Sequence, residues 1–255
     1  MTTYQIVSDL HIEFKNNEYL NPISLIKPTA DVLILAGDIG SLYKINQLFS
    51  FLRDCSYYFK HIIYVLGNHE FYGVSHKKNK SFTELLQSVK MLQCRLSTYD
   101  VSILQRTSIQ IGKTLIAGCT LWSKIDEKKD DDDFDKLFHK IVRISDITQK
   151  SYNDLFLADF DFVQQAIQYC EVKQLELIMV THHVPTFQCS EKEENIKHLY
   201  ASNLENCLES RHIKAWVCGH THKNFDKIIA NTRVVSNQKG KGCDEADNFN
   251  PAFIL

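Results

Sequence analysis

The segment Tyr4-Gln5-Ile6-Val7-Ser8-Asp9-Leu10-His11 contains the pattern that decides the fold, a short apolar run that ends in polar side chains. A run of this length and composition is typical of a buried β-strand. The pattern recurs in apolar runs at residues 32–36, 61–66, 175–180 and 215–218, each followed by polar residues. Helical patterns lie between several of these runs, and strands that alternate with helices predict an α/β fold.

Helices and hairpins are indicated between the strands. The clearest helical pattern covers residues 41–59, where apolar residues recur about every 3.6 positions behind a serine N-cap. A second helix is predicted after Ser81, because Ser81 and Glu84 have the spacing of a capping box. Hairpins are expected around Gly112-Lys113 and Asn231-Thr232, so some strand pairs should be antiparallel.

The chain is interpreted as one domain that spans residues 1–255, because no linker, internal repeat or low-complexity segment divides it. A mostly helical cap is expected at about residues 123–174. The acidic run at 124–135 is interpreted as a solvated surface loop, since like charges repel and the run lacks an EF-hand pattern.

The composition excludes several classes of protein. With 255 residues, 44% of them apolar, the chain can bury a sizeable core, which excludes disordered and collagen-like chains. The formal net charge of -2 gives no overall basic field, so neither nucleic acid nor an anionic membrane surface is an expected partner. The apolar runs are far shorter than the roughly 20 residues that a membrane span requires.

Cysteine usage and the N-terminal sequence favour a cytoplasmic protein. The eight cysteines are scattered without Cys-x-x-Cys spacing, which is typical of reduced thiols rather than of disulfides or a structural zinc site. The first residues enter a strand-like run almost at once and show no basic leader or apolar signal segment. We therefore expect the protein in the cytoplasm.

Potential metal ligands follow all five predicted strands. The carboxyl ends of the strands in an open α/β sheet share one edge, so residues far apart in sequence are expected to converge there. The pairs Asp9/His11 and His220/His222 are each two residues apart, and both members project to the same side if the backbone stays extended. The complete set of candidate ligands is Asp9, His11, Asp38, Asn68, His182, His220 and His222.

These side chains predict a dinuclear metal site. Carboxylates, imidazoles and one amide, without a thiolate, favour divalent ions such as Mn, Fe or Zn. Seven candidates exceed the roughly three or four protein ligands of one catalytic zinc ion but suit two ions that share a carboxylate, with Asp38 as the natural bridge.

The charge of such a site predicts its substrate. Two divalent cations that face only two carboxylates, Asp9 and Asp38, keep a positive charge that attracts an anion such as a phosphate ester. A bridging hydroxide is expected to attack phosphorus, while His69 protonates the leaving oxygen or stabilises its charge. The sequence therefore predicts a metal-dependent phosphoesterase.

The blocks that contain these residues resemble, in order and spacing, those of the calcineurin-like metallophosphoesterase superfamily. The blocks are Ser8-Asp9-Leu10-His11, Gly37-Asp38, Gly67-Asn68-His69-Glu70, Thr181-His182-His183 and Gly219-His220-Thr221-His222. The resemblance covers nearly the whole chain and implies a four-layer α/β/β/α sandwich, in which two mixed central sheets are flanked by helices.

The resemblance also implies a role for each candidate residue. One metal ion is held by Asp9, His11 and His222, and the other by Asn68, His182 and His220, while Asp38 binds both. His69 takes the place of the family's catalytic histidine.

The resemblance is greatest to small, single-domain bacterial-type phosphoesterases, and implies hydrolysis of a phosphomonoester or phosphodiester in a small or nucleotide-like substrate. Residues 39–41 (Ile-Gly-Ser) and 182–184 (His-His-Val) depart from the Asp-Arg-Gly and His-Gly-Gly of Ser/Thr protein phosphatases, so activity of that type is not expected. The sequence leaves open the native metal, the preference between monoesters and diesters, and the oligomeric state.

Two alternative functions are distinguishable by experiment. A catalytically inactive module could use the same fold, with or without metal, to recruit a protein partner, and two bound ions without hydrolysis of any substrate would favour it. A nuclease needs a basic groove, which the near-neutral net charge does not indicate.

Several neighbouring residues are weaker candidates. His182 is preferred to His183 as a ligand, because adjacent residues of an extended segment point in opposite directions. Glu70 is a candidate to orient His69. The candidates to line the pocket are Tyr72, Trp122 and Tyr200.

Overall fold

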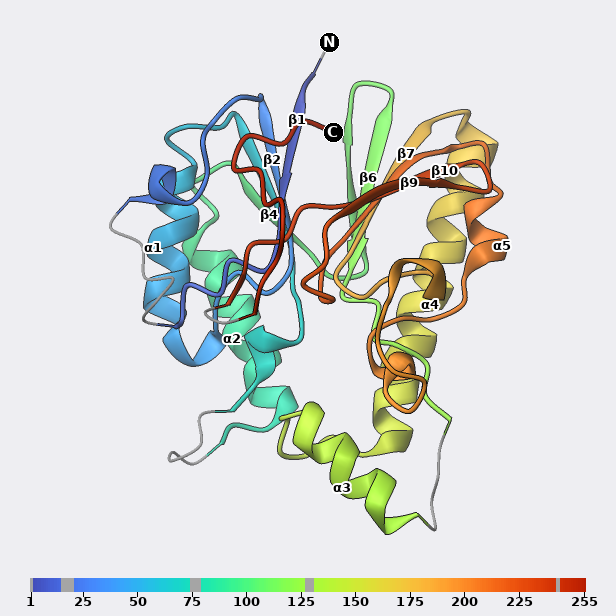
Figure 1. Cartoon of the computed structure of the whole chain (residues 1–255). Coiled ribbons are helices and arrows are strands. Elements are labelled where there is room, and N and C mark those ends of the chain that lie inside the picture. Colours follow the sequence, from blue (N-terminus) through green and yellow to red (C-terminus); the bar gives the residue numbers. More distant parts are fainter. Residues whose placement is uncertain (1, 15–20, 74–78, 127–130, 242–243) are drawn as a thin grey trace.

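The computed structural model of the chain describes residues 2–14, 21–73, 79–126, 131–241 and 244–255. Two central β-sheets lie face to face (Figure 1). Helices α1 (Ile45–Cys55) and α2 (Phe82–Arg95) lie outside one sheet, and helices α4 (Gln149–Lys173) and α5 (Glu205–Leu208) outside the other. The predicted α/β/β/α sandwich is confirmed.

The first sheet consists of four parallel strands in the order β1-β2-β3-β4, whereas both central sheets were expected to be mixed. The strand β2 (Val32–Ala36) is buried along its whole length, as expected of a parallel strand that is covered on both faces. An antiparallel bridge between Gln5 and Ile254 adds to the outer edge. The other strands are β1 (Tyr4–Val7), β3 (His61–Val65) and β4 (Val101–Leu104).

The second sheet is mixed and has six strands in the order β5-β6-β7-β8-β10-β9. Its two edge strands pair antiparallel with their neighbours, which confirms both predicted hairpins, whereas the inner strands are parallel. The strands are β5 (Thr107–Ile111), β6 (Thr114–Cys119), β7 (Glu176–Thr181), β8 (Ile213–Cys218), β9 (Phe225–Ile229) and β10 (Thr232–Ser236). A short pair, β11 (Gly240–Lys241) and β12 (Asp244–Glu245), follows.

Aliphatic side chains fill the space between the sheets. On β2, Val32, Ile34 and Ala36 face this space, whereas Leu33 and Leu35 join the core beneath the helices, because side chains alternate along a strand. The second sheet contributes Ile116, Ile178, Val180, Val217 and Val235. This packing holds the ends of the strands in fixed positions.

Side-chain caps mark the start of α2, α3 (Asp132–Ile141) and α4, whereas α1 and α5 begin without one. Ser81 and Glu84 form the predicted capping box of α2. The helix predicted over 41–59 is shorter in the structure, because its first turn is a 3-10 helix (Leu42–Lys44) that precedes α1. The other 3-10 helices are Pro22–Ser24, His69–Phe71, Phe187–Cys189 and Lys197–Leu199.

The acidic run is partly helical. Helix α3 (Asp132–Ile141) begins within it, and the Asp131 carboxylate accepts a hydrogen bond from the N–H of Phe134. The prediction of a surface loop is therefore wrong for residues 132–135, because carboxylates in the first turn of a helix interact favourably with the helix dipole. Residues 127–130 of the run lie outside the described residues.

Helix α3 lies at the end of the molecule toward which β1 runs (Figure 1). Together with α4, which contacts β6 and β7, it occupies much of the range 123–174. The single-domain organisation and the helical cap stay predictions. No helix in the described ranges combines the length and the apolar character that crossing a membrane requires.

Candidate active site

Residues from five strand ends meet at one edge of the sandwich. The segments that carry them follow β1, β2, β3, β7 and β8. All seven predicted ligands lie here with side chains that are buried or nearly buried: Asp9, His11, Asp38, Asn68, His182, His220 and His222.

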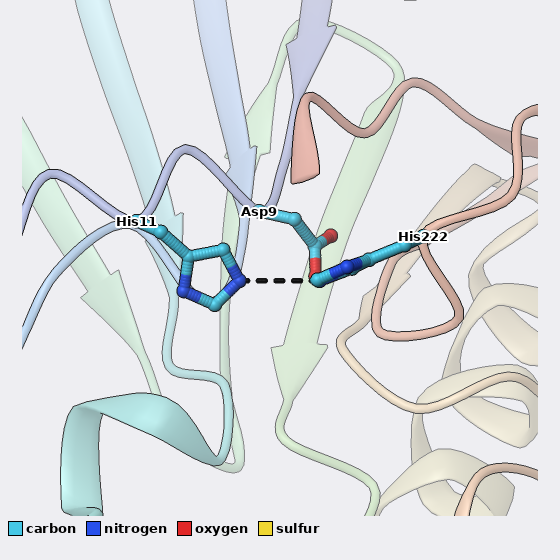
Figure 2. A group of neighbouring side chains, drawn as sticks. All are labelled: Asp9, His11 and His222. Carbon is cyan, nitrogen blue, oxygen red and sulfur yellow. Dashed lines mark hydrogen bonds and ion pairs between the residues drawn. The ribbon is translucent and has the colours of Figure 1, made fainter. Parts of the chain in front are cut away.

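Asp9, His11 and His222 form a first group of side chains (Figure 2). Nε2 of His222 lies 3.2 Å from Nε2 of His11 and 3.4 Å from Oδ1 of Asp9. Two of the three residues follow β1 and the third follows β8, so the group joins the two sheets. One carboxylate and two imidazoles are suitable ligands for a divalent transition metal.

Asp38, His182 and His220 form a second group. Nε2 of His182 lies 3.3 Å from Oδ1 of Asp38 and 2.9 Å from Oδ1 of Asn68, so the Asn68 amide belongs to the same cluster. The ring centroids of His182 and His220 are 5.0 Å apart. This set again consists of oxygen and imidazole nitrogen donors.

Asp38 connects the two groups. Its Oδ2 lies 3.7 Å from Nε2 of His11, while its Oδ1 lies 3.3 Å from Nε2 of His182. A carboxylate with one oxygen directed at each group can bridge two cations. A third group, which consists of His11, Asp38 and His69, overlaps the other two.

Hydrogen bonds on the outer side of two histidine rings orient them. Nδ1 of His11 lies 3.1 Å from Oε1 of Glu13, and Nδ1 of His182 lies 2.9 Å from the carbonyl oxygen of Ala36. These acceptors favour a proton on Nδ1, so each ring directs the lone pair of Nε2 into the site. His220 is turned the other way, with Nε2 3.3 Å from the carbonyl oxygen of Leu199.

The donor set fits a cation. When Nδ1 of His182 donates its proton to the carbonyl oxygen of Ala36, Nε2 directs a lone pair toward the oxygens of Asp38 and Asn68. Three lone-pair donors within this distance repel one another unless a proton or a metal ion lies between them. The residues present are therefore suitable for holding divalent metal ions.

Charges inside the site keep its two carboxylates ionised. Burial raises the pKa of Asp38, but the nearby His182, His69 and His11 lower it more, so this pKa lies well below its ordinary value. For Asp9, burial raises the pKa, but the hydrogen bond and charge of His222 together with the charge of His182 outweigh burial, so the pKa is lowered. Burial also lowers the pKa of His220 well below its ordinary value, and neighbouring His183 and His182 add to this, which favours the neutral ring.

Five of the seven predicted ligands have a left-handed backbone. The φ angles are 52° at Asp9, 47° at His11, 53° at Asp38, 74° at His220 and 54° at His222. The expectation that the Asp9/His11 and His220/His222 pairs continue extended strands is therefore wrong, since β1 and β8 end before them. Left-handed conformations cost an L-residue roughly 1–2 kcal/mol each, and such strain is typical of functional sites.

Glu70 holds the loop that carries Asp38. Its buried carboxylate accepts hydrogen bonds of 2.8–3.1 Å from the backbone N–H groups of Asp38, Ile39 and Gly67. The Tyr64 hydroxyl donates a further bond of 2.6 Å to the same carboxylate. Burial raises the pKa of Glu70, and the Tyr64 hydrogen bond opposes that shift. Glu70 is therefore a positioning residue for Asp38.

Gln238 holds the loop that carries His222. Its Oε1 accepts a 2.7 Å hydrogen bond from the N–H of His222, and its Nε2 donates to the carbonyl oxygen of Lys223 and to Oγ of Ser236 at 2.7 Å and 2.6 Å. The sequence analysis missed this role. The available signal is a pair of uncharged amides, Asn237-Gln238, directly after an apolar strand, both of which are buried.

His69 lies beside the two groups. Oε1 of Glu13 lies 3.7 Å from its Nδ1, and Nζ of Lys241 lies 3.2 Å from its Nε2. Burial lowers the pKa of His69, and the Lys241 charge acts in the same direction. Glu13 thus occupies the position next to His69 that the sequence analysis gave to Glu70. Spacing did not reveal Glu13 or Lys241, because neither belongs to the recurring blocks.

A cavity of about 230 Å³ opens over the ligands. Tyr72 and Tyr200 line it, as predicted, together with Asp38, Asn68, His220 and His222. Trp122 does not line this cavity. Its buried ring packs against Phe71 and Tyr152, with centroids 5.8 Å and 5.4 Å away. His183 is buried behind His220, with ring centroids 4.0 Å apart.

Comparison with known proteins decides the family. The sequence pattern of calcineurin-like phosphoesterases matches residues 4–224, a range that contains every predicted ligand. The chain belongs to the calcineurin-like phosphoesterase family. It is therefore a hydrolase that acts on phosphoric ester bonds, and the family implies divalent metal ions that the His and Asp groups described above can hold.

The chain is also similar to a curated relative and to several solved structures. This phosphoesterase is 27% identical over 281 residues to uncharacterized protein L509 of Acanthamoeba polyphaga mimivirus, covering 100% of this chain and 96% of the relative. Phosphopantetheinyl hydrolase (PptH) from Mycobacterium tuberculosis has a similar structure, with a TM-score of 0.70, 16% identity, and coverage of 99% and 94%. A dimetal phosphatase from Danio rerio has a TM-score of 0.53, 13% identity, and coverage of 92% and 86%. At these identities the structural likeness shows the fold alone.

Proposed function

We propose that this phosphoesterase hydrolyses a phosphomonoester or a phosphodiester at a centre of two divalent cations. The observation that supports it best is the position of Asp38, whose two oxygens lie 3.7 Å and 3.3 Å from imidazole nitrogens of separate groups. In this proposal Asp38 binds both ions. The remaining ligands are Asp9, His11 and His222 for one ion, and Asn68, His182 and His220 for the other.

The chemistry divides between the ions and the protein. When bound, two ions such as Mn, Fe or Zn supply Lewis acidity toward phosphoryl oxygens and lower the pKa of water to near neutrality. The oxygen of that water joins phosphorus as the bond to the leaving oxygen breaks. His69 protonates the leaving oxygen, and Lys241, 3.2 Å from Nε2 of His69, places a positive charge beside the charge that develops there.

Substitutions in the second group test the proposal. Asp38→Ala and Asn68→Ala should reduce the turnover of 4-nitrophenyl phosphate and bis(4-nitrophenyl) phosphate by at least about 100-fold in protein reconstituted with manganese. Asp133→Ala is the matched control, because Asp133 is exposed and, among the residues that the structure describes, its only ion pair is with Lys136 on α3. Elemental analysis should give two ions per wild-type chain.

Two results would contradict the proposal. Unchanged turnover by the Asp38→Ala protein would remove Asp38 from the reaction. A wild-type protein that binds two ions yet hydrolyses neither compound would instead favour the non-catalytic binding module.

We also propose that one domain, residues 1–255, carries this activity in the cytoplasm and that the segment 123–174 caps the site. Lys140, in the last turn of α3, and Arg143, just beyond this helix, line the cavity over the ligands, which supports the cap. The described cysteines are free thiols, which suits a reducing compartment. Limited proteolysis that yields two separately folded fragments, or a fluorescent fusion that leaves the cytoplasm, would contradict these assignments.

A further inference from the structure

A second, larger cavity adjoins the one over the proposed ligands. Its volume is about 750 Å³, against about 230 Å³ for the smaller cavity. His69, Tyr72 and Arg143 line both cavities. A molecule bound at the ligands can therefore extend past His69 into the larger cavity.

Basic side chains surround the smaller cavity. Among the described residues, Asp38 is the one acidic side chain that lines this cavity. None of the lysine and arginine side chains that line the cavity forms an ion pair with another described residue. Lys192 lies over the ring of Tyr200, with Nζ 4.7 Å from the centroid, and Lys241 contacts His69. The four basic residues are Lys140, Arg143, Lys192 and Lys241.

This positive charge exceeds what one phosphate ester requires. Two divalent cations that face two carboxylates are sufficient to attract a single phosphoryl group. Four further cations favour a second one, because Arg and Lys form strong charge-assisted hydrogen bonds with phosphate oxygens. Arg143 lines both cavities and Lys140 precedes it by three residues, which places the second phosphoryl group at the boundary between the cavities.

The larger cavity is suited to an organic group. Its volume falls within the range of roughly 300–1,000 Å³ that is common for small-molecule sites. Aromatic and aliphatic side chains provide much of its wall, and polar groups such as Ser41, Asn79 and Lys44 add hydrogen-bonding positions. The apolar contributors are Phe14, Tyr43, Tyr72, Val142 and Ile144.

We propose that the substrate is an organic pyrophosphate, an inference that rests on the proposed function. The scissile phosphoryl group lies at the ligands, the second phosphoryl group at Arg143 and Lys140, and the organic group in the larger cavity. Water oxygen bonds to the scissile phosphorus, and the bond from that phosphorus to the bridging oxygen breaks. The electron pair leaves with the bridging oxygen as part of an organic phosphate, and the proton of the attacking water passes to solvent.

Four compounds separate the contributions of the second phosphate and of the organic group. ADP-ribose and UDP-glucose contain both, thymidine 5′-(4-nitrophenyl) phosphate contains a nucleoside but one phosphate, and 4-nitrophenyl phosphate contains one phosphate on a small group. With manganese-loaded enzyme, kcat/KM for one of the two pyrophosphates should exceed that for the thymidine diester at least tenfold, although nitrophenolate is a good leaving group.

Variants of Arg143 test whether this residue causes the preference for the pyrophosphate. Arg143→Gln should reduce the ratio of kcat/KM for the pyrophosphate to kcat/KM for the thymidine diester by at least tenfold, and Arg143→Lys should restore part of it. Lys136→Gln is the matched control on α3, the helix that ends just before Arg143, because Lys136 pairs with Asp133 and lines neither cavity.

Binding provides a readout that is independent of turnover. In isothermal titration calorimetry of the manganese-loaded protein, methylenediphosphonate should bind at least tenfold more tightly than methylphosphonate, and Arg143→Gln should abolish most of this difference.

The outcomes separate the two proposals. If the aryl esters are hydrolysed but neither pyrophosphate is preferred, or if Arg143→Gln affects both substrate types equally, the pyrophosphate assignment is overturned while the proposed function stands. If the loaded enzyme hydrolyses none of the four compounds, the proposed function fails, and the pyrophosphate assignment fails with it.

Discussion

The Nε2 atoms of His11 and His222 lie 3.2 Å apart, although 211 positions separate the two residues in the chain. His11 follows a strand of the first sheet and His222 a strand of the second. The first ligand group therefore exists only when both sheets are packed against each other. A metal ion bound there would connect the two halves of the sandwich.

Removal of metal is expected to destabilise the whole fold. A ligand that binds only the folded state stabilises it by about 2.7 kcal/mol when its free concentration is 100 times Kd. Manganese should therefore raise the Tm in differential scanning calorimetry, and EDTA should reverse the shift. The doubly substituted Asp9→Ala/Asp38→Ala protein should show no shift, and an equal shift in it would mean that manganese binds elsewhere.

Replacement of Glu70 by Gln should lower the free energy of unfolding by about 3 kcal/mol, because an amide NH₂ would then face backbone N–H donors in a buried site. Tyr64→Phe removes the hydrogen bond that the Tyr64 hydroxyl donates to Glu70 and should lower the free energy of unfolding by about 1 kcal/mol. Urea unfolding curves measure both values. Equal stability of the wild-type and Glu70→Gln proteins would show that this carboxylate does not hold the Asp38 loop.

Gly219→Ala should weaken metal binding by more than tenfold without unfolding the protein. A Cβ at this position would lie 2.5 Å from Oδ2 of Asp9, so the carboxylate has to move. Gly112→Asn is the control, because no atom lies within 4 Å of a Cβ there and Asn tolerates its φ of +62°. Calorimetric titration with manganese would test the difference. Unaltered affinity in the Gly219→Ala protein would argue against Asp9 as a ligand.

His69→Ala should lower kcat by about 100-fold or more, as expected when a general acid is removed. The metal content should stay at the wild-type value, since the proposal places His69 outside the ligand set. Steady-state kinetics and elemental analysis of one preparation test both statements. Loss of one ion together with activity would assign His69 to the third group, with His11 and Asp38, as a ligand.

Asp31 should contribute a pH-dependent part of the stability. Lys60 and Thr3 contact its carboxylate and lower its pKa from 3.8 to about 2. Because the folded pKa is below the unfolded one, the contribution is present above about pH 5 and is lost as the pH falls toward 2. Asp31→Asn should therefore flatten the dependence of the unfolding free energy on pH in this window. The same slope in both proteins would contradict the assignment.

Local patterns in the sequence were sufficient to predict the layers of the fold and the meeting of the strand ends. Apolar runs gave the strands, and polar residues after them gave the candidate ligands, since parallel strands must present their carboxyl ends together. The prediction that Asp38 and His182 lie close together depended only on this topology, and in the structure Oδ1 of Asp38 lies 3.3 Å from Nε2 of His182.

Other features depend on contacts that spacing does not encode. The Glu13 and Lys241 contacts with His69 join segments outside the recurring blocks, and the backbone hydrogen bonds of Glu70 depend on the exact path of its loop. The extended conformation assumed for Asp9 and His11 failed for a related reason, because turns, unlike strands, have no side-chain period from which to predict them.

The left-handed backbone at the predicted ligands affects how the sequence of this protein can evolve. Positions such as Asp9, Asp38 and His222 hold conformations that glycine adopts without tension. In a lineage that no longer needs the reaction, mutation of one of them to glycine would relieve the backbone strain at that position. Selection for turnover therefore keeps these side chains at positions where the backbone conformation alone would favour glycine.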